Sequence, residues 1–242
     1  MEILEFYRIL SNIDGSVSFT KKNTNTKEMI KLQSQEICPN ENKKNLIIFF
    51  HGWGSSGDNF MHLAKVMSKF LPDSYLVVPN APFEREIGDG YQWFSLEDRS
   101  EEALYNGVKN AASIVNHFIG TKLKELNLKD TQLSLVGFSQ GAMLAMHVAL
   151  TRLQSCASVV AYSGRFLSPS KIAPEIKSKP SICIIHGDAD DVVPFSSLGL
   201  AVKALKENGV NAQGYPIHGL GHIINEEGIR LGVEFIKKNF GN

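Results

Sequence analysis

The sequence predicts an α/β fold in which helices cover both faces of a mainly parallel central sheet. Short, wholly apolar runs such as residues 46–50 recur along the chain, as expected of strands buried on both faces. Segments with apolar residues at helical spacing alternate with these runs. A chain of 242 residues with 43% hydrophobic content suits one such domain. We therefore expect a single domain over 1–242, with residues 1–44 forming a polar extension that carries edge strands.

The elements are predicted in the following order. In the extension, 6–10 and 16–20 are short edge strands, and 21–44 is a polar hairpin or surface segment. Further strands are expected at 46–50, 75–78, 133–136, 157–162, 181–185 and 212–217. Helices are expected at 58–71, 142–153, 196–208 and 226–240, and the longest helix opens at Asp98 with Glu101 as its capping-box partner. A long loop follows residue 78, and the proline-bearing segment 163–180 should hold at most a short helix.

Composition and charge exclude several classes of protein. The 25 basic and 25 acidic side chains balance, which argues against nucleic acid as a principal partner. The N-terminal residues are acidic where a signal peptide needs bases, and no apolar run is long enough for a membrane span. The three cysteines (Cys38, Cys156 and Cys183) are too few and too scattered for a disulfide framework or a zinc site. A cytoplasmic protein with no membrane span and no metal is expected.

The nucleophile candidate is Ser139, in the motif Gly137-Phe138-Ser139-Gln140-Gly141. The motif lies between a predicted buried strand and a predicted amphipathic helix, so the chain has almost no room to turn. Such a turn strains the serine backbone and exposes its hydroxyl above the sheet edge, while glycine on either side avoids a collision with neighbouring backbone. The motif is weak as a bare string, but its place between strand and helix predicts nucleophilic catalysis.

A serine hydroxyl needs a histidine base, and the histidine needs a carboxylate that orients it. His62, His117 and His147 lie within predicted helices, and His51 and His186 directly follow strands, so all five are interpreted as structural. This leaves His218 and His222 after the last strand, of which His222, preceded by glycine and just ahead of the last helix, is preferred. The acid should come from the loop after residue 185, where Asp188, Asp190 and Asp191 are not separated by spacing alone.

Two further parts of a catalytic site can be proposed from the loops. The backbone N–H groups of Gln140 and Trp53 are the expected donors to an oxyanion, because one follows the nucleophile and the other follows the first buried strand. Trp93 and Phe94 on a glycine-bearing loop, with Phe166 on the proline-bearing segment, are predicted to line an acyl groove. Packing of these aromatic side chains onto the body of the protein is an equal alternative.

Two other functions compete with this interpretation. The spacing Gly52-x-Gly54-x-x-Gly57 fits a dinucleotide-binding loop of an oxidoreductase. However, the acidic residue expected at the end of the next strand is missing, since Pro79 and Asn80 stand there. A catalytically silent binding protein is the other alternative, and the intact Ser, Asp and His set argues against it.

These motifs resemble the carboxylesterase, lysophospholipase and acyl-protein thioesterase branch of the α/β-hydrolases, and residues 91–95 look like its bacterial members. The resemblance covers residue 46 to the C-terminus and rests on His51-Gly52-Trp53-Gly54, Pro79-Asn80-Ala81-Pro82, the Ser139 motif, His186-Gly187-Asp188-Ala189-Asp190 and Gly221-His222. It implies an α/β-hydrolase fold, Asp190 as the acid and His222 as the base. It further implies a small acyl ester or thioester as substrate and no cofactor. The sequence does not determine the oligomeric state, and both a monomer and a homodimer are possible interpretations.

Overall fold

The computed structural model describes residues 30–41 and 43–241, so the edge strands predicted at 6–10 and 16–20 lie outside the described residues. Its central sheet has seven strands in the order β1-β3-β2-β6-β7-β8-β9. These strands are β1 (Ser34–Ile37), β2 (Asn45–Phe50), β3 (Ser74–Pro79), β6 (Leu133–Phe138), β7 (Ser158–Tyr162), β8 (Ser181–Gly187) and β9 (Ala212–Ile217). Only β1 runs antiparallel to its neighbour, β3, and all the other pairs are parallel. The predicted α/β architecture is confirmed.

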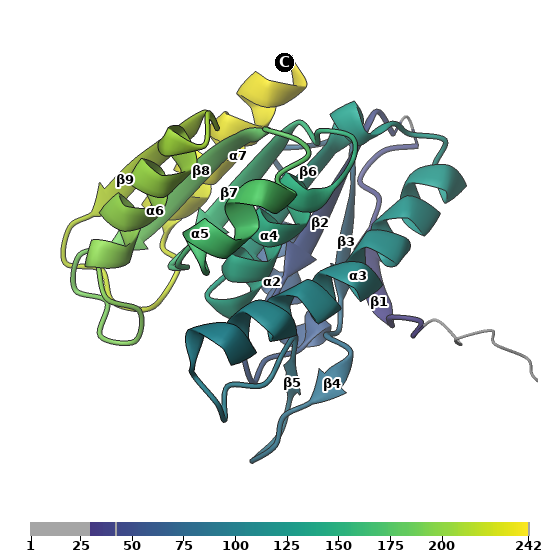
Figure 1. The fold of residues 1–242 in the computed structure, drawn as a ribbon. Coiled ribbons are helices and arrows are strands. Elements are labelled where there is room, and N and C mark those ends of the chain that lie inside the picture. The colour runs from purple at the N-terminus through teal and green to yellow at the C-terminus, as the bar shows by residue number, and fades with distance from the viewer. Residues whose placement is uncertain (1–29, 42, 242) are drawn as a thin grey trace, which may run out of the picture.

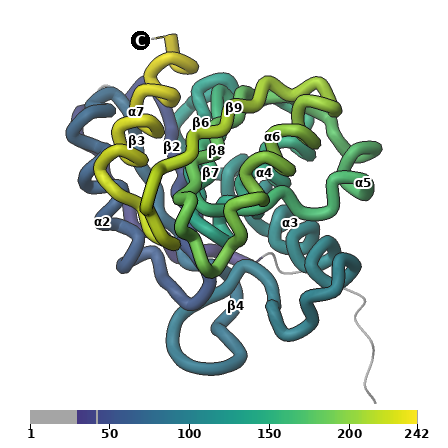
Figure 2. Tube along the Cα trace, turned by 90° about the vertical axis from the view of Figure 1, so that its left-hand side faces the viewer, coloured from purple at the N-terminus to yellow at the C-terminus, as the bar shows by residue number. Residues whose placement is uncertain are grey.

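Helices cover both faces of this sheet (Figure 1). They are α2 (Gly57–Ser68), α3 (Glu101–Glu125), α4 (Gln140–Thr151), α5 (Pro169–Ile172), α6 (Ser196–Glu207) and α7 (Glu226–Phe240). Seen edge-on, α2 and α7 lie on one side of the strands, and α3, α4, α5 and α6 lie on the other (Figure 2). The described residues also form two short 3₁₀ turns, η1 (Asp130–Gln132) and η2 (Ala173–Glu175).

The central strands are buried on both faces because their side chains alternate between two cores. In β2, Leu46, Ile48 and Phe50 pack into the core under α3, α4 and α6. Ile47 and Phe49 pack into the core under α2 and α7. This explains why β2 is an unbroken apolar run, since neither of its faces meets water.

Three local predictions differ from the structure. The segment 21–44 was expected to be a polar hairpin or surface segment; its residues 21–29 and 42 lie outside the described residues, and residues 34–37 form the edge strand β1. The N-cap of α3 is Ser100, whose hydroxyl accepts from Ala103 N at 3.2 Å, while Asp98 accepts from Ser100 N at 2.8 Å. The long loop after β3 contains a small two-stranded sheet of β4 (Phe83–Glu84) and β5 (Tyr91–Gln92). The pairing of β1 with β3, the cap at Ser100 and the pairing of β4 with β5 all depend on hydrogen bonds, which the spacing of apolar residues does not predict.

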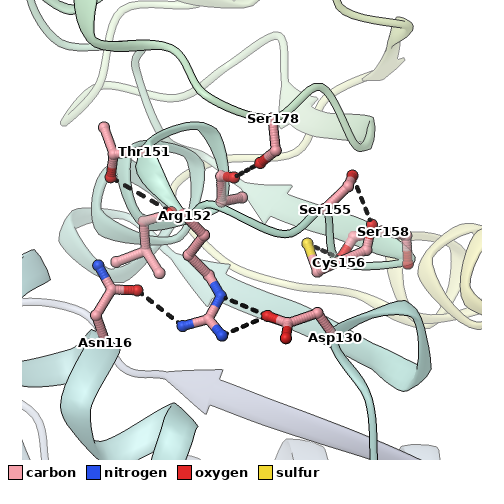
Figure 3. A network of polar contacts seen from close by, with 10 residues as sticks. Asn116, Asp130, Thr151, Arg152, Ser155, Cys156, Ser158 and Ser178 are labelled. Carbon is pink, nitrogen blue, oxygen red and sulfur yellow. Dashed lines mark hydrogen bonds and ion pairs between the residues drawn. The ribbon is translucent and has the colours of Figure 1, made fainter.

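The helix that follows Ser139 is fixed at its far end by Arg152, which caps α4 (Figure 3). Its guanidinium donates from Nη1 to Asn116 Oδ1 on α3 at 2.9 Å and from Nε to Asp130 Oδ1 on η1 at 3.0 Å. The Arg152 side chain is only 11% exposed, so this ion pair is better shielded than one on the surface. These contacts hold α4, and with it the turn at Ser139, against α3.

Among the described residues, no helix combines the length and the apolar character needed to cross a membrane.

Candidate active site

Ser139 lies where β6 turns directly into α4. Its backbone has φ 53° and ψ −117°, a conformation that residues with a side chain seldom adopt. Glycine is needed on both sides, because a Cβ at Gly137 would collide with the backbone of Gly141, and a Cβ at Gly141 would collide with the backbone of Phe50. The backbone N–H of Ser139 donates to Tyr162 O on β7 at 2.9 Å, which holds the strained turn in place. The side chain is half-buried at the carboxyl edge of the sheet.

His222 and Asp190 form a partly buried pair at the same edge. Asp190 follows β8 and His222 follows β9, and these two strands are neighbours. His222 Nδ1 donates to Asp190 Oδ2 at 2.8 Å, and the aspartate side chain is fully buried. Because Nδ1 is engaged, Nε2 is the ring nitrogen left to accept a proton. The imidazole packs against Phe138, the residue before the serine, with 4.8 Å between ring centroids.

The competing loop residues make a separate pair at the surface. His218 Nδ1 donates to Asp188 Oδ2 at 2.8 Å, and the His218 side chain is 99% exposed. Asp188 also accepts from Gly219 N at 2.6 Å. Asp191 is exposed as well. Of the three aspartates that spacing alone could not separate, only Asp190 lies within hydrogen-bond reach of His222.

Both oxygens of Asp190 are held by donors. Oδ1 accepts from the backbone N–H groups of Val192 and Val193 at 2.9 and 2.8 Å. Burial alone would raise the pKa of Asp190, but hydrogen bonds from His222 and from the two backbone N–H groups hold it below the usual value. The carboxyl group is therefore ionised at neutral pH and can stabilise a positively charged imidazole.

His186 is a contact of Asp190 that the sequence interpretation missed. Its Nε2 lies 2.9 Å from Val193 O and 3.2 Å from Asp190 Oδ2, and its side chain is fully buried. Two acceptors face this nitrogen, so Nε2 carries the proton and His186 donates toward the carboxylate. The sequence feature that could have indicated this contact is the position of His186, four residues before Asp190 and at the end of a buried strand.

The predicted oxyanion donors lie beside the serine. A Cβ added to Gly52 would stand 3.5 Å from the Cβ of Ser139, so the loop that carries Trp53 packs directly on the nucleophile. Within the described parts of the chain, no hydrogen bond uses the backbone N–H of Trp53 or of Gln140. Both groups are therefore available to a charge that develops next to Ser139.

Of the two alternatives for Trp93 and Phe94, lining of an acyl groove is wrong, and packing onto the body of the protein is what the structure shows. Trp93 is 0% exposed and Phe94 is 2% exposed, because both belong to the core under α3 and α4. The Trp93 indole donates to His51 O at 2.9 Å. The buried side chain of Gln140 fixes their loop, since its Oε1 accepts from Trp93 N at 2.9 Å and its Nε2 donates to Phe94 O at 2.7 Å. These aromatic residues therefore support the site from behind.

A cavity of about 450 Å³ adjoins Ser139, Gln140, Trp53 and His222. Its apolar lining is supplied by Leu96, Leu104, Phe138, Met143, Val192, Val193 and Pro194. Phe166 lines a neighbouring cavity of about 610 Å³ instead. A third cavity, of about 690 Å³, continues from Trp53, Phe138 and His222 toward α2 and α7. The residues next to the serine thus form the centre of an extended, mostly apolar surface depression.

The loop that resembles a dinucleotide-binding motif is occupied by the protein itself. Gly57 N donates to Asn80 Oδ1 at 2.7 Å, so the N-terminus of α2, where a pyrophosphate would bind, already has an acceptor. The Ser56 hydroxyl caps the same helix through Asn59 N at 3.2 Å. Gly54 lies against Arg85. Among the described residues, no group of three His, Cys, Asp or Glu side chains is arranged to hold a metal ion.

Known proteins resemble the chain over most of its length. The sequence profile of the phospholipase/carboxylesterase family matches residues 33–240, which extends the likeness N-terminal to residue 46 and includes β1. Acyl-protein thioesterase 1 homolog 1 of Dictyostelium discoideum is 28% identical over 204 residues, covering 79% of this chain and 89% of that relative. Esterase YpfH of Escherichia coli is 24% identical over 202 residues, covering 82% and 84%. The solved structure of esterase PE8 has a TM-score of 0.82 at 32% identity and covers 86% of this chain and 99% of its own.

Proposed function

Because the chain belongs to the phospholipase/carboxylesterase family of α/β-hydrolases, we propose that it cleaves carboxylic esters or thioesters through a triad of Ser139, His222 and Asp190. The observation that carries this proposal is the partly buried contact of 2.8 Å between His222 Nδ1 and Asp190 Oδ2. It leaves the other ring nitrogen of His222 without a hydrogen bond among the described residues, and His222 and Ser139 both line the same cavity.

In the first half of the reaction, Ser139 Oγ attacks the acyl carbonyl carbon, and His222 Nε2 takes the hydroxyl proton. The carbonyl π electrons move to the oxygen, and that oxyanion accepts hydrogen bonds from the N–H groups of Trp53 and Gln140. The bond to the leaving group then breaks, and the proton passes from His222 to the departing alcohol or thiol. The product is an acyl ester of Ser139.

Water completes the cycle by the same route. His222 takes a proton from the water as its oxygen attacks the acyl-enzyme, and the tetrahedral oxyanion again lies against Trp53 and Gln140. Collapse releases the carboxylic acid and returns the proton to Ser139 Oγ. The ionised Asp190 stabilises the imidazolium that forms twice in each turnover.

The proposal is tested by replacing the nucleophile. Ser139→Ala should lower kcat for p-nitrophenyl esters on the order of 10⁶-fold, because the acyl-enzyme can no longer form. A chain-length series of p-nitrophenyl esters, assayed beside an acyl thioester, will define the substrate. Hydrolysis by Ser139→Ala at the parent's rate would refute the triad, provided that circular dichroism shows the same fold for both proteins.

A further inference from the structure

Two arginine side chains, Arg99 and Arg165, line the cavity that holds Ser139 and His222. Both are exposed, and no aspartate or glutamate is among the residues lining that cavity. Arg99 directly precedes the N-cap of α3, while Arg165 lies on the loop after β7. The fold thus brings two cations from distant parts of the chain to one mostly apolar cavity.

These two arginines differ from the other arginines in the described residues. Arg152 pairs with Asp130, and Arg230 pairs with Glu234 at 2.8 Å. The guanidinium of Arg85 lies over the ring of Trp53, 4.3 Å from its centroid. Within 30–41 and 43–241, neither Arg99 nor Arg165 forms an ion pair with a carboxylate of the chain.

Most of the N–H donors of Arg99 and Arg165 form no hydrogen bond within the described residues. Each guanidinium has five N–H donors in a planar fork that matches a carboxylate or phosphate. In the described residues, Arg99 uses one donor, with Nε 3.4 Å from Leu96 O, and Arg165 uses none. Leu96 lines the same cavity, and the remaining donors of Arg99 have no acceptor among the described residues.

The charge is confined to one side of the catalytic pair. Arg99 and Arg165 also border the neighbouring 610 Å³ cavity, where Glu101, Lys203 and Glu207 provide charges of both signs. On the other side of His222, the 690 Å³ cavity carries Glu226 and no lysine or arginine. Of the two cavities that meet at His222, the one with Arg99 and Arg165 is therefore the one whose lining favours a negatively charged part of a substrate.

We propose that Arg99 and Arg165 together bind a carboxylate or other oxyacid group carried by the ester, so that the site prefers anionic esters to neutral ones of the same size. The proposal rests on the esterase activity proposed above, and it assigns the two arginines as specificity-determining residues. The anion can belong to the acyl chain or to the leaving group, and matched substrates distinguish the two.

The test uses two pairs of substrates. For the acyl side, p-nitrophenyl hydrogen adipate is compared with p-nitrophenyl hexanoate. For the leaving group, the butyryl thioester of 3-mercaptopropionate is compared with that of propanethiol, with the released thiol measured by Ellman's reagent. In at least one pair, kcat/KM should be about tenfold higher or more for the anionic substrate, since a charged hydrogen bond contributes that much to binding.

Neutralising either arginine should abolish the preference. Arg99→Gln and Arg165→Gln should bring the anionic-to-neutral ratio close to one, mainly through a higher KM for the anionic substrate. Arg230→Gln, which removes an exposed arginine on α7, is the matched control and should keep the parent's ratio. Raising the ionic strength should reduce the ratio in the parent, because exposed charges are screened by salt.

The outcomes separate this proposal from the proposed function. If the parent hydrolyses the neutral esters, Ser139→Ala does not, and neither pair shows an anionic preference, the arginine proposal alone is refuted. An anionic preference that survives in both arginine variants refutes it equally. Failure of the parent to hydrolyse any of the four substrates would instead count against the esterase activity itself.

Discussion

Asp190 is held by hydrogen bonds on both of its oxygens, whereas Asp188 and Asp191 are exposed on the same loop. This difference in burial matters because a carboxylate orients a histidine well only when it cannot turn away into solvent. His222 has one such partner among the described residues. The choice of acid is therefore a property of a single side chain and not of the acidic loop as a whole.

Exchanging each aspartate for asparagine tests this assignment. Asp190→Asn should lower kcat by roughly 10⁴-fold, because an amide favours the wrong tautomer of His222. Asp188→Asn and Asp191→Asn should stay within about tenfold of the parent, since they act only through the local field. All three variants are measured at one pH with one p-nitrophenyl ester. An equally large loss in Asp191→Asn would place the acid one residue later.

His186 should act as a positioning residue through Asp190. His186→Leu removes the Nε2 donor that bonds Val193 O and lies 3.2 Å from Asp190 Oδ2, so we expect kcat to fall by about tenfold. His186→Gln keeps an N–H donor near the same place and should restore most of the activity. Thermal melting of both variants is the control. If His186→Gln and His186→Leu lower kcat equally at the same melting temperature, the imidazole of His186 contributes only by packing.

At the scale of elements, the turn from β6 into α4 allows no side chain at residue 141. A Cβ there would collide with the carbonyl groups of Phe50 and His51 on the neighbouring strand end. These atoms belong to the backbone, which cannot move aside as a flexible side chain can. The close approach of α4 to β2 is what places Ser139 next to the loop of Trp53.

Substitution of glycine in two helices should therefore have opposite effects. Gly141→Ala should abolish activity and lower the melting temperature, because α4 must move away from β2. Gly120→Ala, in the exposed part of α3 where a Cβ meets no atom within 4 Å, should stabilise the protein by about 0.5–1 kcal/mol. Chemical denaturation measures both variants. An active, stable Gly141→Ala protein would contradict the packing described for this turn.

At the scale of the whole molecule, two buried histidines link stability to pH. Burial lowers the pKa of His51 and of His147 from 6.5 to about 4. Between these values the unfolded chain binds more protons than the folded protein, so the free energy of unfolding falls as the pH drops from 6.5 toward 4. His51 has partners for both nitrogens, in Gly52 O and Ala81 N. His147 Nδ1 is buried without a partner in the described structure.

His147→Leu should remove part of this pH dependence. At pH 5, the pKa difference corresponds to about 2 kcal/mol of lost stability for one such histidine. The variant should therefore be more stable than the parent by about that amount at pH 5, with a smaller difference at pH 8. Urea denaturation at the two pH values provides the comparison. A stability difference of the same size at pH 5 and pH 8 would show that protonation of His147 does not lower the stability of the parent protein at acidic pH.

Much of this architecture could be predicted because its signals are local. A strand buried on both faces needs a continuous apolar run, and an amphipathic helix needs apolar residues every three or four positions. Both patterns are complete within one segment, and the inner strands β2, β3, β6, β7 and β8 follow the first of them. The turn at Ser139 was likewise predictable, because its glycines, its strand and its helix are adjacent in the chain. The edge strand β1 was missed because it is polar and depends on pairing with β3.

The site depended on contacts between distant segments. The sequence alone established that a serine turn, an acidic loop and a histidine loop follow strands of one parallel sheet. It did not distinguish Asp190 from Asp188, because spacing along a loop does not determine the direction of a side chain. Only the tertiary structure buried Trp93 and Phe94, placed His186 against Asp190 and brought Arg99 and Arg165 to one cavity. Such contacts form when the strands pair and the helices pack, so they depend on the whole fold.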